Sequence, residues 1–285
     1  MAIDSARLQD TAPGPDGASH TLQWRDMPQA RSIDEVILAL SGILRVCGIE
    51  KSRLGYFPAL YRRVTEHVKA GIGAGRFEDG ARMERLDVAF ANRYLDAWDA
   101  WRNRRTVTAC WRVAFEAGSH WRPVILQHLL AGMNAHINLD LAIAAAATCP
   151  GPEIQKLKTD FDRINQLLAE LVDPMERELA DVSPWIGLIE TFGGHAEGAI
   201  VNFDIRAARD LAWQRALRLA NLQESEEEMA LALTIMGMDW AVAGLGKLIL
   251  HPGPLLQTGL LLVRAREESD AVKVMVALTQ PGGNG

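Results

Sequence analysis

The stretch Pro123–Ala147, PVILQHLLAGMNAHINLDLAIAAAA, decides the fold. Its apolar residues recur at the three- and four-residue spacing of a helix, and Pro123 suits the first turn of one. No Lys, Arg or Glu occurs between Arg122 and Glu153, so this helix has no charged face to turn toward water. We therefore predict a long helix that is surrounded by protein on all sides.

Helical periodicity continues on both sides of this stretch. Ser32 and Asp173 begin two patterns typical of a capping box, and the second places a helix start at Pro174. The other expected helices are 57–70, 80–103 with a cap at Asp79, 107–117, 153–172, 199–221, 225–250 and one after Pro254. Ala271–Thr279 is compatible with a strand but has no partner strand. The expected fold class is all-α, a single globular bundle of roughly nine to eleven helices.

The expected domain organisation is a loose N-terminal arm (1–31), an all-helical domain (32–270) and a C-terminal tail (271–285). The arm is rich in Pro and Gly and has little apolar periodicity. No signal peptide and no apolar run of membrane-spanning length is evident, so a cytoplasmic protein without a membrane span is expected.

Composition narrows the class of partner. The 285-residue chain is 48% hydrophobic and carries a net charge of −6 without a basic tract, which disfavours nucleic-acid binding. Its three cysteines, Cys47, Cys110 and Cys149, are widely spaced, and we interpret them as free thiols in a reducing compartment. The expected partners are a small-molecule substrate and, through the apolar stretch Gly244–Val263, a possible second copy in a homodimer.

Polar residues inside the central helix are the main candidates for a site. His136 and Asp140 are four residues apart on one side of the apolar stripe, and Asn134 and Asn138 lie on its other side. A buried carboxylate is unfavourable unless it is paired or binds a cation. His136 and Asp140 are therefore either two metal ligands, a base with its orienting carboxylate, or a purely structural pair.

The string Gly132–Leu141, GMNAHINLDL, resembles a bacterial family known only as domain of unknown function 5995. The likeness also covers Phe57–Val68, Phe77–Ala97, Trp111–Phe115, Asp160–Asn165 and Arg209–Leu217. This resemblance implies an all-helical fold and no particular reaction. The pair His136 and Asp140 is also similar to the HxxxD pair of helical zinc enzymes of the phospholipase C and P-one nuclease type, but the chain has no HxxxE pair and lacks their N-terminal Trp.

Other residues complete the candidate set. Asp87 lies in an apolar stretch and is the best third ligand or catalytic carboxylate, while His67 and His128 are further possible metal ligands. The candidate substrate-binding residues are Asn134, Asn138, Tyr94, His195 and Arg209. Each also has a structural interpretation, as a core residue, a surface-loop histidine or a salt-bridge partner.

Three functions remain open at this point. The first is a metal-dependent, hydrolase-like enzyme in which zinc, manganese or iron at His136, Asp140 and Asp87 activates water. The second is a metal-free helical enzyme that uses His136 and Asp140 as an acid–base dyad. The third is a non-enzymatic binding or scaffold protein. Phosphate-binding loops, a GxSxG elbow and an HExxH motif are all missing from the sequence.

Overall fold

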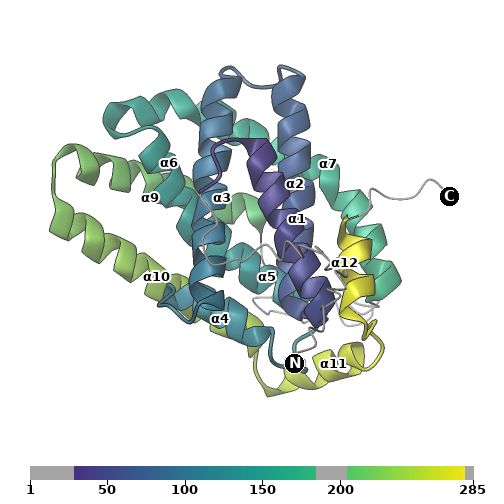
Figure 1. Ribbon diagram of the computed structural model, residues 1–285. Coiled ribbons are helices and arrows are strands. Elements are labelled where there is room, and N and C mark those ends of the chain that lie inside the picture. The colour runs from purple at the N-terminus through teal and green to yellow at the C-terminus, as the bar shows by residue number, and fades with distance from the viewer. Residues whose placement is uncertain (1–28, 184–203, 280–285) are drawn as a thin grey trace, which may run out of the picture.

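The computed structural model describes residues 29–183 and 204–279, and every regular element in these residues is helical (Figure 1). The α-helices are α1 (Ile33–Glu50), α2 (Tyr56–Gly73), α3 (Gly80–Arg102), α4 (Ala109–Ala117), α5 (Ile125–Ala135), α6 (Leu141–Thr148), α7 (Lys158–Val182), α9 (Ile205–Glu224), α10 (Glu228–Leu250), α11 (Pro254–Arg264) and α12 (Ala271–Thr279). Three shorter turns are η2 (Arg53–Gly55), η3 (His136–Asp140) and η4 (Gly151–Leu157). The predicted all-α bundle is confirmed.

The predicted central helix is the axis of the bundle. It consists of α5, η3 and α6 in succession, and 83% of its most apolar window is buried. Helices α2, α4 and α10 pack on α5, whereas α3 and α9 pack on α6. Gly132 permits the contact with α2, because a Cβ atom there would lie 2.6 Å from the ring of Phe57. The apolar side chains of these helices merge into one large core.

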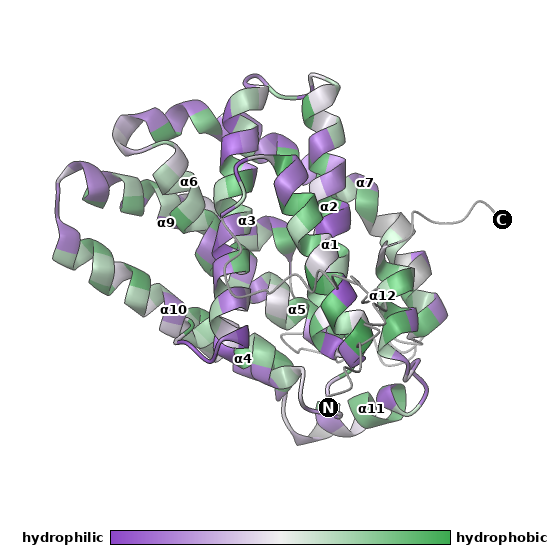
Figure 2. Ribbon diagram, viewed as in Figure 1, coloured by the Kyte–Doolittle hydropathy of each residue, from purple (hydrophilic) through white to green (hydrophobic). Residues whose placement is uncertain are grey.

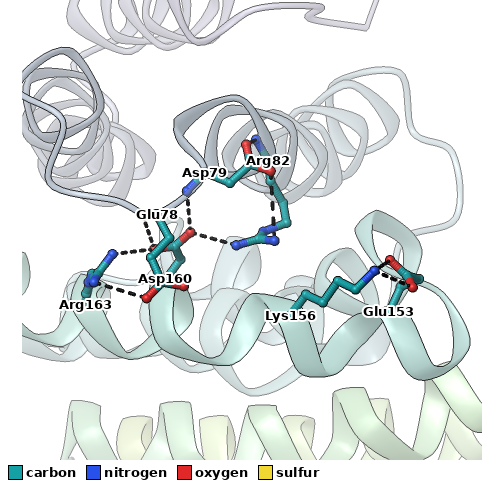
Figure 3. Close-up of polar contacts among 7 residues, drawn as sticks. All are labelled: Glu78, Asp79, Arg82, Glu153, Lys156, Asp160 and Arg163. Carbon is teal, nitrogen blue, oxygen red and sulfur yellow. Dashed lines mark hydrogen bonds and ion pairs between the residues drawn. The ribbon is translucent and has the colours of Figure 1, made fainter.

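A buried carboxylate fastens α3 to α7 (Figure 3). The Asp160 side chain has no exposed surface and accepts hydrogen bonds from the backbone N–H groups of Glu78 and Asp79, at 2.7 and 3.0 Å. It also forms ion pairs with Arg82 at 2.9 Å and Arg163 at 3.0 Å. Asp79 in turn caps α3 by accepting from the Arg82 N–H, as the sequence predicts.

Three sequence-based expectations about secondary structure are wrong. The central helix is not α-helical throughout, because η3 is a π-helical turn. No helix starts at Pro174, because α7 continues through this position; along its length it packs against α2, η4 and α12. Ala271–Thr279 was expected to belong to a tail without a helix, but it forms α12 and packs Val274 and Leu278 into the core, so tertiary burial overrides its β-branched composition.

Other expectations are confirmed or lie partly outside the described residues. All three cysteines are free and buried. Of the proposed arm, residues 1–28 lie outside the described part, and Ala30 is held by two hydrogen bonds with the Asn92 side chain.

Two described helices have the length and composition of a membrane span. The helix Ile125–Thr148 is the buried core helix, whereas only 22% of the most apolar window of α10 is buried. The core position of the first explains its composition, whereas α10 exposes large apolar side chains to solvent.

Candidate active site

The π-helical turn η3 sets the position of the two candidate residues. It begins at His136 and ends at Asp140, and the Leu141 N–H binds the His136 carbonyl five residues earlier. Such turns widen a helix locally and occur frequently at functional sites. Both side chains are almost completely buried, with 3% of His136 and none of Asp140 exposed.

Three groups donate to the Asp140 carboxylate. The Trp111 indole N–H donates to Oδ2 at 2.8 Å, and Arg93 Nε donates to Oδ1 at 3.2 Å. His136 Nδ1 lies 3.2 Å from Oδ2. Because a carboxylate only accepts, Nδ1 carries the proton and Nε2 keeps a free lone pair. Asp140 thereby orients His136 as a base.

The imidazole of His136 is enclosed by aromatic rings. It stacks on Phe90 with centroids 3.6 Å apart and receives the edge of Tyr61 at 4.5 Å. Burial lowers the pKa of His136, and the hydrogen bond and charge of Asp140 only partly oppose this shift. The ring is therefore neutral at pH 7. Its buried Nε2 has no hydrogen-bond partner among the described residues.

His136 faces a cavity of about 120 Å³. Apolar side chains from α2, α3, α5, η3, α6, α7 and α9 form most of its wall. The ionisable side chains in this wall are Tyr61, Asp87, His136 and Arg209. A mainly apolar wall with a few polar groups has the composition of a small-molecule site, and this volume admits only a very small ligand.

Asp87 supplies a carboxyl group in the wall of this cavity. It is buried, and its Oδ2 has no hydrogen-bond partner among the described residues. Burial, with a smaller contribution from Glu84, raises the pKa of Asp87 to about 7. At neutral pH a large share of Asp87 is therefore protonated and able to donate a proton.

Arg209 supplies a buried positive charge, with only 5% of the residue exposed. Its Nε donates to Asn165 Oδ1 and its Nη2 to the Phe161 carbonyl, both at 2.6 Å. Within the described residues we find no carboxylate in ion-pair distance of Arg209. Burial lowers its pKa to about 10, so it remains a cation at neutral pH. The cavity wall thus includes a cation whose direct hydrogen-bond partners, among the described residues, are neutral.

The other predicted substrate-binding residues that the structure describes lie outside the cavity wall. Tyr94 is fully buried against the rings of Phe57 and Trp111, and its hydroxyl group has no partner among the described residues. Asn134 donates to the Val242 carbonyl, and Asn138 donates to Asn134 Oδ1. The two asparagines therefore connect η3 and α5 to α10. His195 lies outside the described residues.

The five predicted metal ligands are not brought together. Half-exposed His67 binds Glu170 at 3.0 Å, next to Arg76. His128 packs edge-on against Tyr56, and burial lowers its pKa to about 3. In the part of the chain that the structure describes, no three His, Cys, Asp or Glu residues are grouped so as to hold a metal ion.

Sequence reasoning missed four residues that build the site. They are Tyr61 and Phe90, which contact the His136 ring, and Arg93 and Trp111, which bind Asp140. All four lie within segments that carry the family resemblance. Their roles become visible only when α2, α3 and α4 are packed against η3.

Comparison with known proteins agrees with the sequence resemblance. The model of the family of unknown function DUF5995 matches residues 33–252. No curated protein and no solved structure matches the chain significantly.

Proposed function

We propose that this chain, which belongs to the DUF5995 family, is a metal-independent acid–base enzyme that acts on a small, mainly apolar substrate. The observation that carries the proposal is the oriented pair His136 and Asp140. His136 lines the same cavity as Asp87, and neither His136 Nε2 nor Asp87 Oδ2 has a hydrogen-bond partner among the described residues. Asp140 is a poor candidate for a metal ligand because Trp111 and Arg93 already occupy its oxygens. The donor set therefore favours the metal-free alternative.

The residues divide the proton transfers between them. His136 Nε2 accepts a proton from a bound water molecule or from an acidic C–H group of the substrate. Asp140 holds the Nδ1 proton and stabilises the imidazolium that forms. Protonated Asp87 delivers one proton to the substrate atom on which negative charge develops. Exchange with solvent after product release then restores the neutral imidazole and the carboxylic acid.

The cavity limits the size of the substrate. An apolar cavity of roughly 150 Å³ holds benzene, so the smaller volume of about 120 Å³ admits at most a single ring or a short branched chain. Arg209 favours a substrate with a negative charge, because a guanidinium group can donate two hydrogen bonds to one carboxylate. We therefore propose a small aromatic or short-chain carboxylic acid, or a derivative that retains the acid group.

Replacement of His136 by glutamine tests the catalytic role. We expect any turnover found in a panel of small nitrophenyl esters, or in proton–deuterium exchange of arylacetates followed by NMR, to fall about 10²–10⁴-fold. Glutamine retains a polar side chain of similar length but removes the base. His128→Gln is the matched control, because it changes a second buried histidine outside the cavity wall and should leave turnover unchanged.

Chelation separates the two enzymatic alternatives in the same assay. The acid–base proposal expects full turnover after EDTA treatment. Turnover that disappears on chelation and returns with zinc or manganese would support a metal-dependent hydrolase, and unchanged turnover in His136→Gln would exclude His136 as the base.

Replacement of Arg209 by glutamine tests the substrate class. We expect calorimetric binding of benzoate or phenylacetate to weaken about 10–100-fold, because a hydrogen bond to a charged group contributes about 1.5–3 kcal/mol. Benzyl alcohol, which has no charge, should bind both proteins with the same affinity. Equal affinity of the wild type for benzoate and benzyl alcohol would show that Arg209 is only a structural cation.

A further inference from the structure

The two faces of α10 differ sharply in their environment. One face is anchored to the bundle: Asp239 caps α4 through the N–H groups of Ala109 and Cys110, and the Val242 carbonyl accepts from Asn134. The other face is exposed and apolar, and most of the helix appears hydrophobic in Figure 2, where α10 lies at the lower left. The large exposed side chains are Met229, Leu233, Met236, Trp240 and Leu248, of which Met229 is 74% and Trp240 68% exposed.

Three small residues lie among these large ones on the same face: Gly237, Ala241 and Gly244. Nothing lies within 4 Å of a Cβ atom added at either glycine, so the bundle does not require them. An exposed glycine inside a helix costs about 1 kcal/mol relative to alanine. Small residues on a helix surface do, however, permit the close approach of a second helix.

The order of large and small residues matches an antiparallel copy of the same helix. With a twofold axis between positions 238 and 239, Leu233 faces Gly244 of the second copy and Trp240 faces Gly237. In the same register Met236 faces Ala241, and Met229 faces Leu248. Every opposed pair except the last therefore places a large side chain against a small one, as close helix packing requires.

The charges at the two ends of α10 favour the same orientation. Glu226, Glu227 and Glu228 lie at its start and Lys247 near its end, and we find no side-chain ion pair to any of them within the described residues. An antiparallel pair brings the acidic end of one helix to the basic end of the other, whereas a parallel pair places the glutamates together. The acidic end also disfavours an anionic membrane surface.

We infer that the exposed face of α10 is the interface of a twofold-symmetric homodimer in which two α10 helices pack antiparallel. Such an isologous interface is the commonest form of a homo-oligomer. With roughly 200 Å² for a fully exposed large side chain, the five large residues present on the order of 600 Å², and a standard interface buries roughly 800 Å² per partner. The small residues and the charged ends supply the remainder.

Sedimentation velocity of the full chain, from low to high micromolar concentration, measures the association directly. We expect the wild type to be a dimer and Gly244→Leu to be a monomer, because leucine fills the space that Leu233 of the second copy occupies. Leucine raises both helix propensity and surface hydrophobicity. If the wild type associated only through non-specific hydrophobic contacts, this variant would therefore associate more strongly. Gly73→Leu, at an equally open position at the end of α2, is the matched control and should remain dimeric.

Disulfide trapping tests the orientation. The double variant Leu233→Cys, Gly244→Cys should form a covalent dimer under mild oxidation, and neither single variant should. Within one helix the two positions are about 16 Å apart, too far for an internal disulfide. The three native cysteines are buried and do not compete.

Two results would overturn the inference. One is that the wild type stays monomeric at all concentrations. This result would overturn the inference even if the protein co-floated with phosphatidylcholine or phosphatidylglycerol vesicles in a density gradient, since the apolar face would then bind a membrane. The other is a dimer that Gly244→Leu leaves unchanged, because the contact would then lie on another surface.

Discussion

Replacement of Asp160 by alanine is expected to lower the free energy of unfolding by about 3–5 kcal/mol, measured by urea denaturation at pH 7. The substitution removes the acceptor for two backbone N–H groups and leaves Arg82 and Arg163 without their shared carboxylate (Figure 3). Since these groups belong to α3, α7 and the segment before α3, the loss affects the whole bundle rather than one surface.

The pH dependence of the same variant provides a second test. Burial alone would raise the pKa of Asp160, but the N–H groups of Glu78 and Asp79 and the charge of Arg82 outweigh it and hold the pKa below its usual value. The contribution of Asp160 to stability is therefore present above the unfolded-state pKa and is lost as the pH falls. The difference between wild type and variant should shrink on acidification.

Glu153→Ala is the control for the Asp160 prediction. Glu153 pairs with Lys156 nearby, but both side chains are more than half exposed (Figure 3). Exposed ion pairs contribute little, so a change within about 0.5 kcal/mol is expected. A similarly small change in Asp160→Ala would mean that the Asp160 carboxylate does not hold α3 and α7 together.

Replacement of Asp87 by asparagine is expected to stabilise the protein at alkaline pH. Because the pKa of Asp87 is raised to about 7, the folded state binds a proton that the unfolded state releases near pH 4. Wild-type stability should therefore decline between about pH 4 and pH 7, and the neutral amide removes this decline. The stability of the variant relative to wild type should rise by roughly 2–3 kcal/mol between pH 5 and pH 8.5.

Calorimetric melting at these two pH values checks the Asp87 prediction. The amide leaves one buried N–H group to be satisfied, which lowers the stability of the variant by a similar amount at both pH values. The informative quantity is therefore the change with pH. A variant whose stability follows the wild type at both values would indicate that Asp87 is already ionised and partnered at pH 5.

The fold was accessible from the sequence because burial leaves a periodic signal. Pro123–Ala147 contains no Lys, Arg or Glu, and this alone predicts a core helix. Ser32 and Asp79 cap the helices that follow them, as their positions predict. The signal failed at Ala271–Thr279, where side-chain shape favours a strand and only contacts with α2 and α7 select a helix.

The candidate site could be predicted in part. His136, Asp140 and Asp87 were identified because polar groups in apolar stretches need partners. The partners themselves, Trp111 and Arg93, lie 29 and 47 residues from Asp140 along the chain, and no local pattern connects them. The sequence also indicated Arg209 as a candidate, but it could not show that no carboxylate of the described residues pairs with it, because this depends on how α7 and α9 pack.

The π-helical turn has a consequence for the chain length of related proteins. Such a turn is an α-helix that carries one surplus residue, and this residue shifts the phase of all that follows by about 100°. Ahead of it Gly132 and Asn134 face α2 and α10, and beyond it α6 packs between α3 and α9. A relative that lost one residue between Gly132 and Leu141 would rotate α6 out of this phase and separate His136 from Asp140. The number of residues within the motif must therefore stay fixed for the two halves of the core to remain in register.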